Sequence, residues 1–275
     1  MKSLQRRNGI KLTIRTLSLF LLAIIYSFPI LYMVFSSFKK ESDIAPPSMT
    51  FRPTLENYRT IIDSDLFLHF SNSLVVALFT VVVTSLLALP ISYVIVFGKL
   101  RKPTGLYNWY LTTLILPPVA VIIPIYIVLN YLGLLDSRFA LVVLYSAIGV
   151  PLMVWLCTTY MMDVPDSVIE ASKIDGCGRW KSFKHVIWPL IRSGAFSTCL
   201  LVFITTWNEF LFAIAFTFTK AGTLPVFMNR YMTQQGLFWG KMSAAATMAM
   251  LIPIVLGFVA QKSLIRGITA GAVKE

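Results

Sequence analysis

The chain alternates between long apolar runs and short polar connections. Six runs contain few or no ionisable residues, and each reaches about the 20 residues that an α-helix needs to cross roughly 30 Å of hydrocarbon. The predicted spans cover 16–38, 71–97, 107–130, 139–161, 194–219 and 242–262. The pattern therefore predicts an all-α polytopic membrane protein with six transmembrane helices.

The polar connections define the remaining organisation. A core transmembrane domain is expected over 71–263, and the first span stands apart from it. The flanking and connecting segments are 1–15 at the N-terminus, 39–70 between the first two spans, 163–192 between the fourth and fifth, 220–241 between the fifth and sixth, and 264–275 at the C-terminus. The first apolar run is too long for a secretory signal, so it is expected to remain in the mature protein.

Composition supports a membrane location and excludes several other classes. Hydrophobic residues make up 57% of the 275 residues and charged residues 13%, and the mean hydropathy is +0.75. A soluble enzyme or a disordered chain carries roughly twice that share of charge. Three well-separated cysteines, Cys157, Cys177 and Cys199, show no metal-ligand spacing, so free thiols and no metal site are expected.

The net charge of +12 reflects membrane orientation. If the N-terminus is cytoplasmic, 16 of the 24 lysines and arginines fall on cytoplasmic segments. Positive residues are enriched on that side of membrane proteins. Both termini are therefore predicted to be cytoplasmic, and no nucleic-acid partner is needed to explain the charge.

The loop 163–192 shows a helix–turn–helix pattern. Pro165 begins the first helix, Asp175-Gly176 ends it, and a second amphipathic element is expected to end at Pro189. Two interpretations remain open. One is a helix lying in the lipid headgroups, and the other is a docking surface for a cytoplasmic partner.

The sequence Glu170-Ala171-Ser172-Lys173-Ile174-Asp175-Gly176 resembles the EAA loop of bacterial ABC importer permeases. Other matches to the carbohydrate branch, in its smaller, maltose-permease-like subunit, are 54–58, 72–73, 116–118, 133–134, 207–210, 223–225 and 266–274. Ser172, Cys177, Trp188 and Ser193 depart from the usual pattern. The resemblance implies the type I importer permease fold.

The resemblance also implies that the loop is a coupling helix seated on a separate ATPase dimer. The residues expected to couple to the ATPase are Glu170, Ala171, Ser172, Asp175, Gly176, Cys177, Trp180, Phe183 and Pro189, and a C-terminal tail with Gly267, Gly271 and Lys274 is expected to reach the same subunits. The sequence has no GxxxxGK[ST] phosphate loop. A non-catalytic subunit without its own cofactor is therefore expected, with ATP and Mg²⁺ on the partner.

Further expected partners are a second permease subunit, in a heterodimer, and an extracytoplasmic solute-binding protein, within a bacterial or archaeal cytoplasmic membrane. The substrate would be a carbohydrate, of the oligosaccharide, disaccharide, polyol or glycerol-phosphate type. Candidate contacts to the binding protein are Thr223, Pro225, Tyr231, Phe238 and Trp239. The alternative is that these aromatic residues anchor the loop at the membrane interface.

Glu209 is the one carboxylate well inside a predicted span, which makes it a functional candidate because intramembrane charge is costly. Residues proposed to line the substrate path are Trp207, Asn208, Glu209, Tyr93, Tyr126 and Asn130. A structural hydrogen-bond site is the alternative for Glu209. An ion-coupled secondary carrier would use Glu209 as a relay. A membrane enzyme would need converging His, Asp, Ser or metal ligands, whereas the two histidines, His69 and His185, lie on opposite predicted faces.

Overall fold

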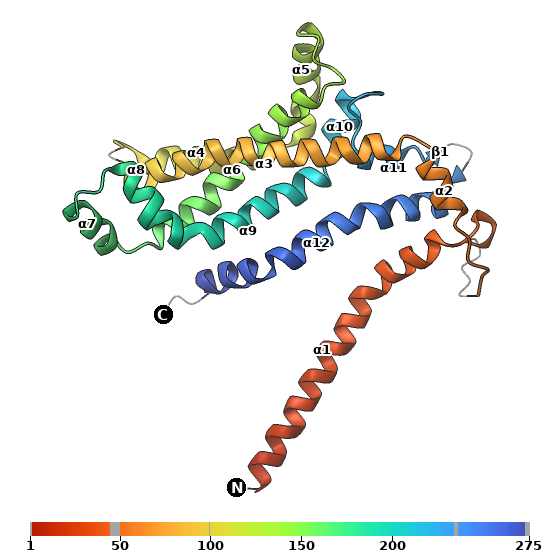
Figure 1. Ribbon diagram of the computed structural model, residues 1–275, viewed down its shortest axis with the longest axis horizontal. Coiled ribbons are helices and arrows are strands. Elements are labelled where there is room, and N and C mark those ends of the chain that lie inside the picture. Colours follow the sequence, from red (N-terminus) through yellow and green to blue (C-terminus); the bar gives the residue numbers. More distant parts are fainter. Residues whose placement is uncertain (1, 45–49, 99, 234–235, 273–275) are drawn as a thin grey trace. The chain divides into compact units, whose positions relative to one another are not determined.

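The computed structural model describes residues 2–44, 50–98, 100–233 and 236–272, and it is helical almost throughout (Figure 1). The chain divides into two compact units, Met1–Leu66 with Met228–Met250 and Phe67–Phe227 with Leu251–Glu275.

The first unit contains α1 and the segments that follow it. Its elements are α1 (Lys2–Ser37), η1 (Glu41–Asp43), α2 (Glu56–Ile62), the strands β1 (Met232–Thr233) and β2 (Gly236–Leu237), and the beginning of α12 (Trp239–Ala272). The buried Asn57 amide donates to the carbonyls of Ser37 and Lys39 at 2.9 and 2.7 Å. The Glu41 carboxylate accepts the backbone N–H of Gly240 at 3.1 Å. Two side chains thus satisfy the end of α1 and the start of α12, whose backbone groups have no partner within their own helix.

The second unit contains the remaining helices. They are α3 (Leu66–Phe97), α4 (Pro103–Thr113), α5 (Pro118–Tyr131), α6 (Arg138–Met162), α7 (Asp166–Ile174), α8 (Arg179–Ser182), η2 (Phe183–Ile187), α9 (Trp188–Trp207), α10 (Leu211–Phe216), α11 (Leu224–Asn229) and the rest of α12. Helices α6 and α9 lie side by side (Figure 1). Gly194 of α9 permits this close approach. Any larger residue there would place a Cβ only 2.5 Å from the Tyr160 ring of α6.

Five helices of this chain are long and apolar enough to cross a membrane, counted over the described residues. They are Arg15–Ser37, Leu66–Phe97, Arg138–Met162, Arg179–Trp207 and Trp239–Gln261. The expected third span is instead a pair, α4 and α5, bent by 89°. Pro117 and Pro118 explain the break: neither has a backbone N–H, and a residue before proline is driven out of the helical region.

The expected fifth span also differs from a single helix over 194–219. The continuous helix begins much earlier, at Arg179, and ends at Trp207, after which α10 is a separate short helix. The prediction that Pro189 ends the second hairpin element is wrong, because Pro189 lies in the first turn of α9. The π-helical turn η2 directly precedes it. That wider turn shifts the carbonyl with which a proline ring would clash, so the helix continues through Pro189.

Candidate functional site

The hairpin between α6 and α9 is closed by a left-handed glycine. Gly176 has φ +72° and follows the last residues of α7. The backbone N–H of Cys177 donates to the Ser172 carbonyl at 3.0 Å, and that of Gly176 to the Lys173 carbonyl at 3.1 Å. This pair of bonds is the Schellman motif, and it requires a residue that tolerates positive φ. The sequence Asp-Gly therefore fixes where α7 ends and where the chain turns.

One face of α7 anchors the hairpin to the bundle. Ile169 is buried against Met161, Val164 and Ile187. Beside it, the buried Ser172 hydroxyl donates to the Ile169 carbonyl at 2.8 Å and lies 3.0 Å from the Ser182 hydroxyl. Because both hydroxyls are buried, each must keep a hydrogen-bond partner. Ser172 therefore joins α7 to α8, and its role in this structure is internal packing.

The opposite face of α7 is open. Glu170, Ala171, Asp175 and Gly176 are all exposed. Ile174 is 86% exposed, although isoleucine is among the residues most often buried. A carboxylate, a small residue and a large apolar side chain thus share a solvent-facing surface on a rigidly anchored helix. Ile174 was not among the expected coupling residues, although its position between the charged Lys173 and Asp175 indicates an exposed site.

The structure does not place all expected coupling residues on this face. Trp180 and Phe183 stack on each other at 6.0 Å between ring centroids and line a groove along α3. Cys177 is half-buried, and Pro189 is exposed at the start of α9. Gly267 and Gly271 lie in the last turns of α12, while Lys274 lies outside the described residues.

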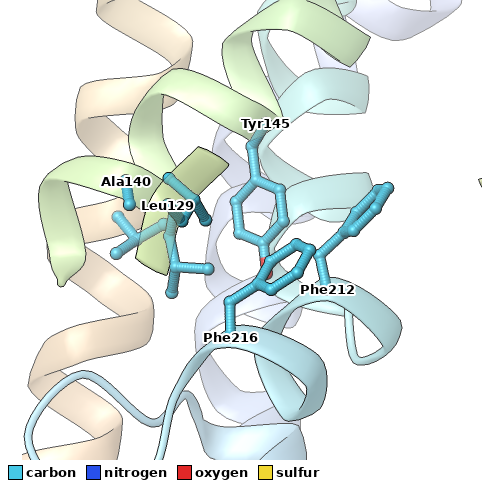
Figure 2. Close-up of a cluster of buried hydrophobic side chains, with 7 residues drawn as sticks. Leu129, Ala140, Tyr145, Phe212 and Phe216 are labelled. Atoms are coloured by element: carbon cyan, nitrogen blue, oxygen red, sulfur yellow. The ribbon is translucent and has the colours of Figure 1, made fainter. Parts of the chain in front are cut away.

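Glu209 is held by three donors in the break between α9 and α10. The Tyr145 hydroxyl of α6 donates to Oε2 at 2.5 Å, the N–H of Phe212 to Oε1 at 2.9 Å, and the N–H of Ala213 to Oε2 at 3.3 Å. The carboxylate thus caps the N-terminus of α10, where negative charge is favoured. Figure 2 shows the buried Tyr145 ring directed toward Phe212 and Phe216.

A cavity of about 230 Å³ adjoins Glu209 and Tyr145. Leu114 and Pro118, at the break between α4 and α5, also line it, as does Thr206. Irregular backbone at membrane depth is tolerated where it is buried in protein or lines a water-accessible cavity. Residues from both breaks thus line the same cavity, beside the hydrogen-bonded pair of Tyr145 and Glu209.

The other residues expected on the substrate path do not join this cluster. Trp207 is buried and packs against Phe203 at 5.6 Å. The Asn208 amide donates to the Ile204 carbonyl of its own helix at 2.9 Å. Tyr93 packs edge-on against Phe183 near the hairpin. Tyr126 and Asn130 are exposed on α5. Of the six expected residues, only Glu209 lines the cavity beside Tyr145.

Asp136 was not singled out from the sequence, but its side chain binds a segment of the backbone. It has φ +55°, and its carboxylate accepts four successive N–H groups between α10 and α11, from Phe218, Thr219, Lys220 and Ala221. Burial alone raises the pKa of a carboxyl, but these four donors hold the pKa of Asp136 well below its usual value. The segments that follow α5 and α10 are thereby joined.

The expected binding-protein contacts fall in both units. Thr223 is buried, so its assignment as a surface contact is contradicted by the structure. Its carbonyl accepts the N–H of Phe227 at 3.0 Å, in the first turn of α11. Pro225, Tyr231 and Phe238 are half-buried, and Trp239 is 46% exposed at the start of α12.

Comparison with known proteins places this geometry in a family. Residues 88–270 match the model of the family described as "Binding-protein-dependent transport system inner membrane component". A similar protein is the "Probable ABC transporter permease protein y4oR" of Sinorhizobium fredii, 33% identical over 92% of each chain. Another is the "Trehalose/maltose transport system permease protein MalG" of Thermococcus litoralis, 32% identical over 98% of this chain and 99% of the other.

A solved bacterial ABC transporter "involved in the import of the acidic polysaccharide alginate" contains a chain of the same fold, with a TM-score of 0.76 at 19% identity over 94% and 97% of the two chains. The chain belongs to the family of inner membrane components of binding-protein-dependent transport systems. It is the permease subunit of an ABC importer, a non-catalytic membrane component with an all-α fold. The ion-coupled carrier using Glu209 is not favoured.

Proposed function

We propose that this permease imports a carbohydrate with energy from a separate ATPase that docks on the exposed face of α7. The observation that carries the proposal is the hairpin: Glu170, Ala171 and Ile174 face solvent on a helix whose other face is buried. Once the ATPase covers this face, the Glu170 carboxylate would be partly buried and could form a strong hydrogen bond with a basic group of the ATPase. Ile174 would supply apolar contact area.

The proposed assembly contains a second permease subunit, two ATPase subunits that bind ATP and Mg²⁺, and an extracytoplasmic binding protein. A carbohydrate is favoured because the MalG relative carries trehalose and maltose in its name and the structurally similar chain belongs to an alginate importer. The charge distribution supports cytoplasmic termini and a cytoplasmic hairpin. The binding protein would approach the opposite side, where Trp239 and Phe238 are candidate contacts.

In the proposed cycle, closure of the ATPase dimer moves the hairpins and changes which side of the membrane the path faces. Coupling requires that the hairpin move as a rigid body. Ile169, Ser172 and the Schellman turn at Gly176 give it that rigidity. Glu170 transmits force to the hairpin without contributing to its internal packing, so its loss is expected to uncouple transport while leaving the fold intact.

The test uses the whole complex in lipid nanodiscs, with ATPase activity measured alone, with the binding protein, and with the binding protein plus candidate sugars. Stimulation by one sugar-loaded binding protein is expected, and Glu170→Ala should reduce that stimulation by roughly tenfold. Asp63→Ala removes an exposed carboxylate at the end of α2 and serves as the control.

The two variants should have the same melting temperature as the wild type. The proposal fails if no ATPase co-purifies with the chain, or if Glu170→Ala and Asp63→Ala hydrolyse ATP equally well in the presence of the loaded binding protein. Stimulation only by a binding protein loaded with an amino acid or metal would overturn the carbohydrate assignment and leave the importer assignment standing.

A further inference from the structure

A groove of about 380 Å³ runs between the last third of α3 and the α8–η2 segment. Its walls are mainly apolar or aromatic. The side chains that carry the argument are Leu86, Pro90 and Val94 from α3, and Arg179, Trp180 and Phe183 from the hairpin. None of the exposed α7 residues Glu170, Ala171 and Ile174 lines this groove.

The walls of the groove are rigid. Phe183 packs edge-on against Tyr93 at 5.7 Å and stacks on Trp180 at 6.0 Å, so three rings form one continuous surface. Leu86 and Trp180 remain 69% and 75% exposed. Apolar surface of this kind needs an apolar neighbour, and α3 is one of the helices able to cross a membrane. The occupant must therefore be apolar and must be present at membrane depth.

The hairpin segment that forms one wall of the groove is positively charged. Arg179 lines it, and Lys181 and Lys184 are exposed on the same short segment. The sequence contains no carboxylate between Arg179 and Glu209, whereas α7 carries Asp166 and Glu170. Basic pockets beside transmembrane helices on the cytoplasmic side bind anionic lipid headgroups. Charge thus separates the hairpin into an acidic part and a basic part.

The depth of the groove fits a phospholipid. Pro90 lies seven residues before the end of α3 at Phe97, about 10 Å along the helix. That distance places the α3 side of the groove beside the first part of an acyl chain. The long side chain of Arg179, which lines the same groove, can extend toward the headgroups. A soluble ATPase cannot enter the hydrocarbon where Leu86 and Val94 lie.

We propose that the groove binds one anionic phospholipid of the cytoplasmic leaflet, with an acyl chain against Leu86, Val94 and Trp180 and the phosphate paired with Arg179. The lipid proposal takes one point from the proposed function, which is that the hairpin lies on the cytoplasmic side of the membrane. The bound lipid would fill the space between α3 and the hairpin and would support α8.

The experiment adds phosphatidylglycerol or phosphatidylcholine to the delipidated full complex and measures retained lipid by native mass spectrometry. The wild type is expected to retain phosphatidylglycerol with roughly tenfold preference over phosphatidylcholine. Arg179→Gln should abolish the preference, and Leu86→Trp, which fills the groove from an exposed position, should lower retention of both lipids. Arg101→Gln removes an exposed arginine outside the groove and should behave as wild type.

A photo-crosslinker identifies the occupant directly. With p-benzoylphenylalanine at Val94, a lipid adduct supports the proposal, whereas an adduct to the second permease subunit overturns it. Equal retention of the two lipids, or retention unaffected by Arg179→Gln and Leu86→Trp, also overturns it. Lipid retention is measured without nucleotide, so its failure is distinguishable from loss of stimulated ATPase activity, which concerns the proposed function.

Discussion

The hydroxyl of Tyr145 donates a 2.5 Å hydrogen bond to the carboxylate of Glu209, which joins α6 to the break between α9 and α10. Two backbone N–H groups of α10 bind the same carboxylate. A charge inside a predicted span is thereby given three donors, as a carboxylate in a poorly hydrated place requires. The Glu209 carboxylate, held by Tyr145, therefore fixes where α10 begins.

Replacing Tyr145 with phenylalanine is expected to lower the free energy of unfolding by about 1–2 kcal/mol, because the half-buried Glu209 carboxylate loses its side-chain donor while the ring packing remains. The measurement is thermal or denaturant unfolding of the purified complex. Tyr131→Phe is the matched control, since Tyr131 is 89% exposed. Equal stability of the two variants would show that the hydrogen bond contributes nothing.

Glu209→Gln and Glu209→Ala should differ in a graded way. Glutamine keeps an oxygen that can accept the Phe212 N–H, whereas alanine leaves both α10 donors unsatisfied, so the alanine variant should be less stable by about 1 kcal/mol or more. ATP-driven uptake by the glutamine variant should stay within a few-fold of wild type. Complete loss of uptake with unchanged stability would instead support a proton relay.

Asp136 predicts a pH dependence of stability. Its pKa in the folded protein lies below that of the unfolded chain, so the unfolded state takes up the proton first and stability falls as pH falls. The contribution is complete above about pH 4, near the ordinary pKa of aspartate, and decreases below it. Melting temperatures between neutral pH and about pH 3 should therefore decline more for wild type than for Asp136→Asn.

At neutral pH, Asp136→Asn should already lose about 1–3 kcal/mol, because an amide cannot accept four N–H groups. Asp63→Asn changes an exposed carboxylate and controls for loss of charge. If wild type and Asp136→Asn follow parallel curves with pH, the four backbone donors do not set the titration.

Gly176→Ala tests the turn of the hairpin. A Cβ at Gly176 meets no neighbouring atom, so the whole effect comes from its φ of +72°, and a destabilisation of about 1 kcal/mol is expected. Gly178 also has open space, but its φ of −66° suits any residue. Gly178→Ala should therefore be neutral or slightly stabilising.

Hydrogen exchange of the hairpin amides measures the difference between these glycines. Faster exchange at Cys177 in Gly176→Ala, with wild-type exchange in Gly178→Ala, is the expected pattern, because the Cys177 N–H closes the turn. Identical exchange in both variants would mean that the left-handed conformation carries no local strain.

The sequence could predict the apolar helices and the hairpin turn because both depend on local signals. Long runs without ionisable residues identify the spans, and Asp175-Gly176 identifies the end of α7. Pro117-Pro118 also marks a break, but an angle of 89° depends on how both half-helices pack, which periodicity does not encode. The helix end predicted at Pro189 was wrong for the same reason. The π-helical turn η2, which lets the helix continue through Pro189, depends on packing and leaves no local signal in the sequence.

The polar site was only half predictable. Glu209 stands out as a carboxylate in an apolar run, whereas Tyr145 is one aromatic residue among many, and its hydroxyl matters only through a partner 64 positions away. Asp136 is similar, since its four donors lie more than 80 positions away along the chain. Such long-range pairs leave no periodic signal in a single sequence.

The 89° bend between α4 and α5 has a consequence for how the protein enters the membrane. Helix α4 has 11 residues and α5 has 14, about 16 and 21 Å long, so each is shorter than the hydrocarbon layer. Neither half can be inserted as an independent span during synthesis. The pair is therefore expected to enter the bilayer only in company with α3 or α6, and mutations that delay those neighbours should expose this segment to quality-control proteases.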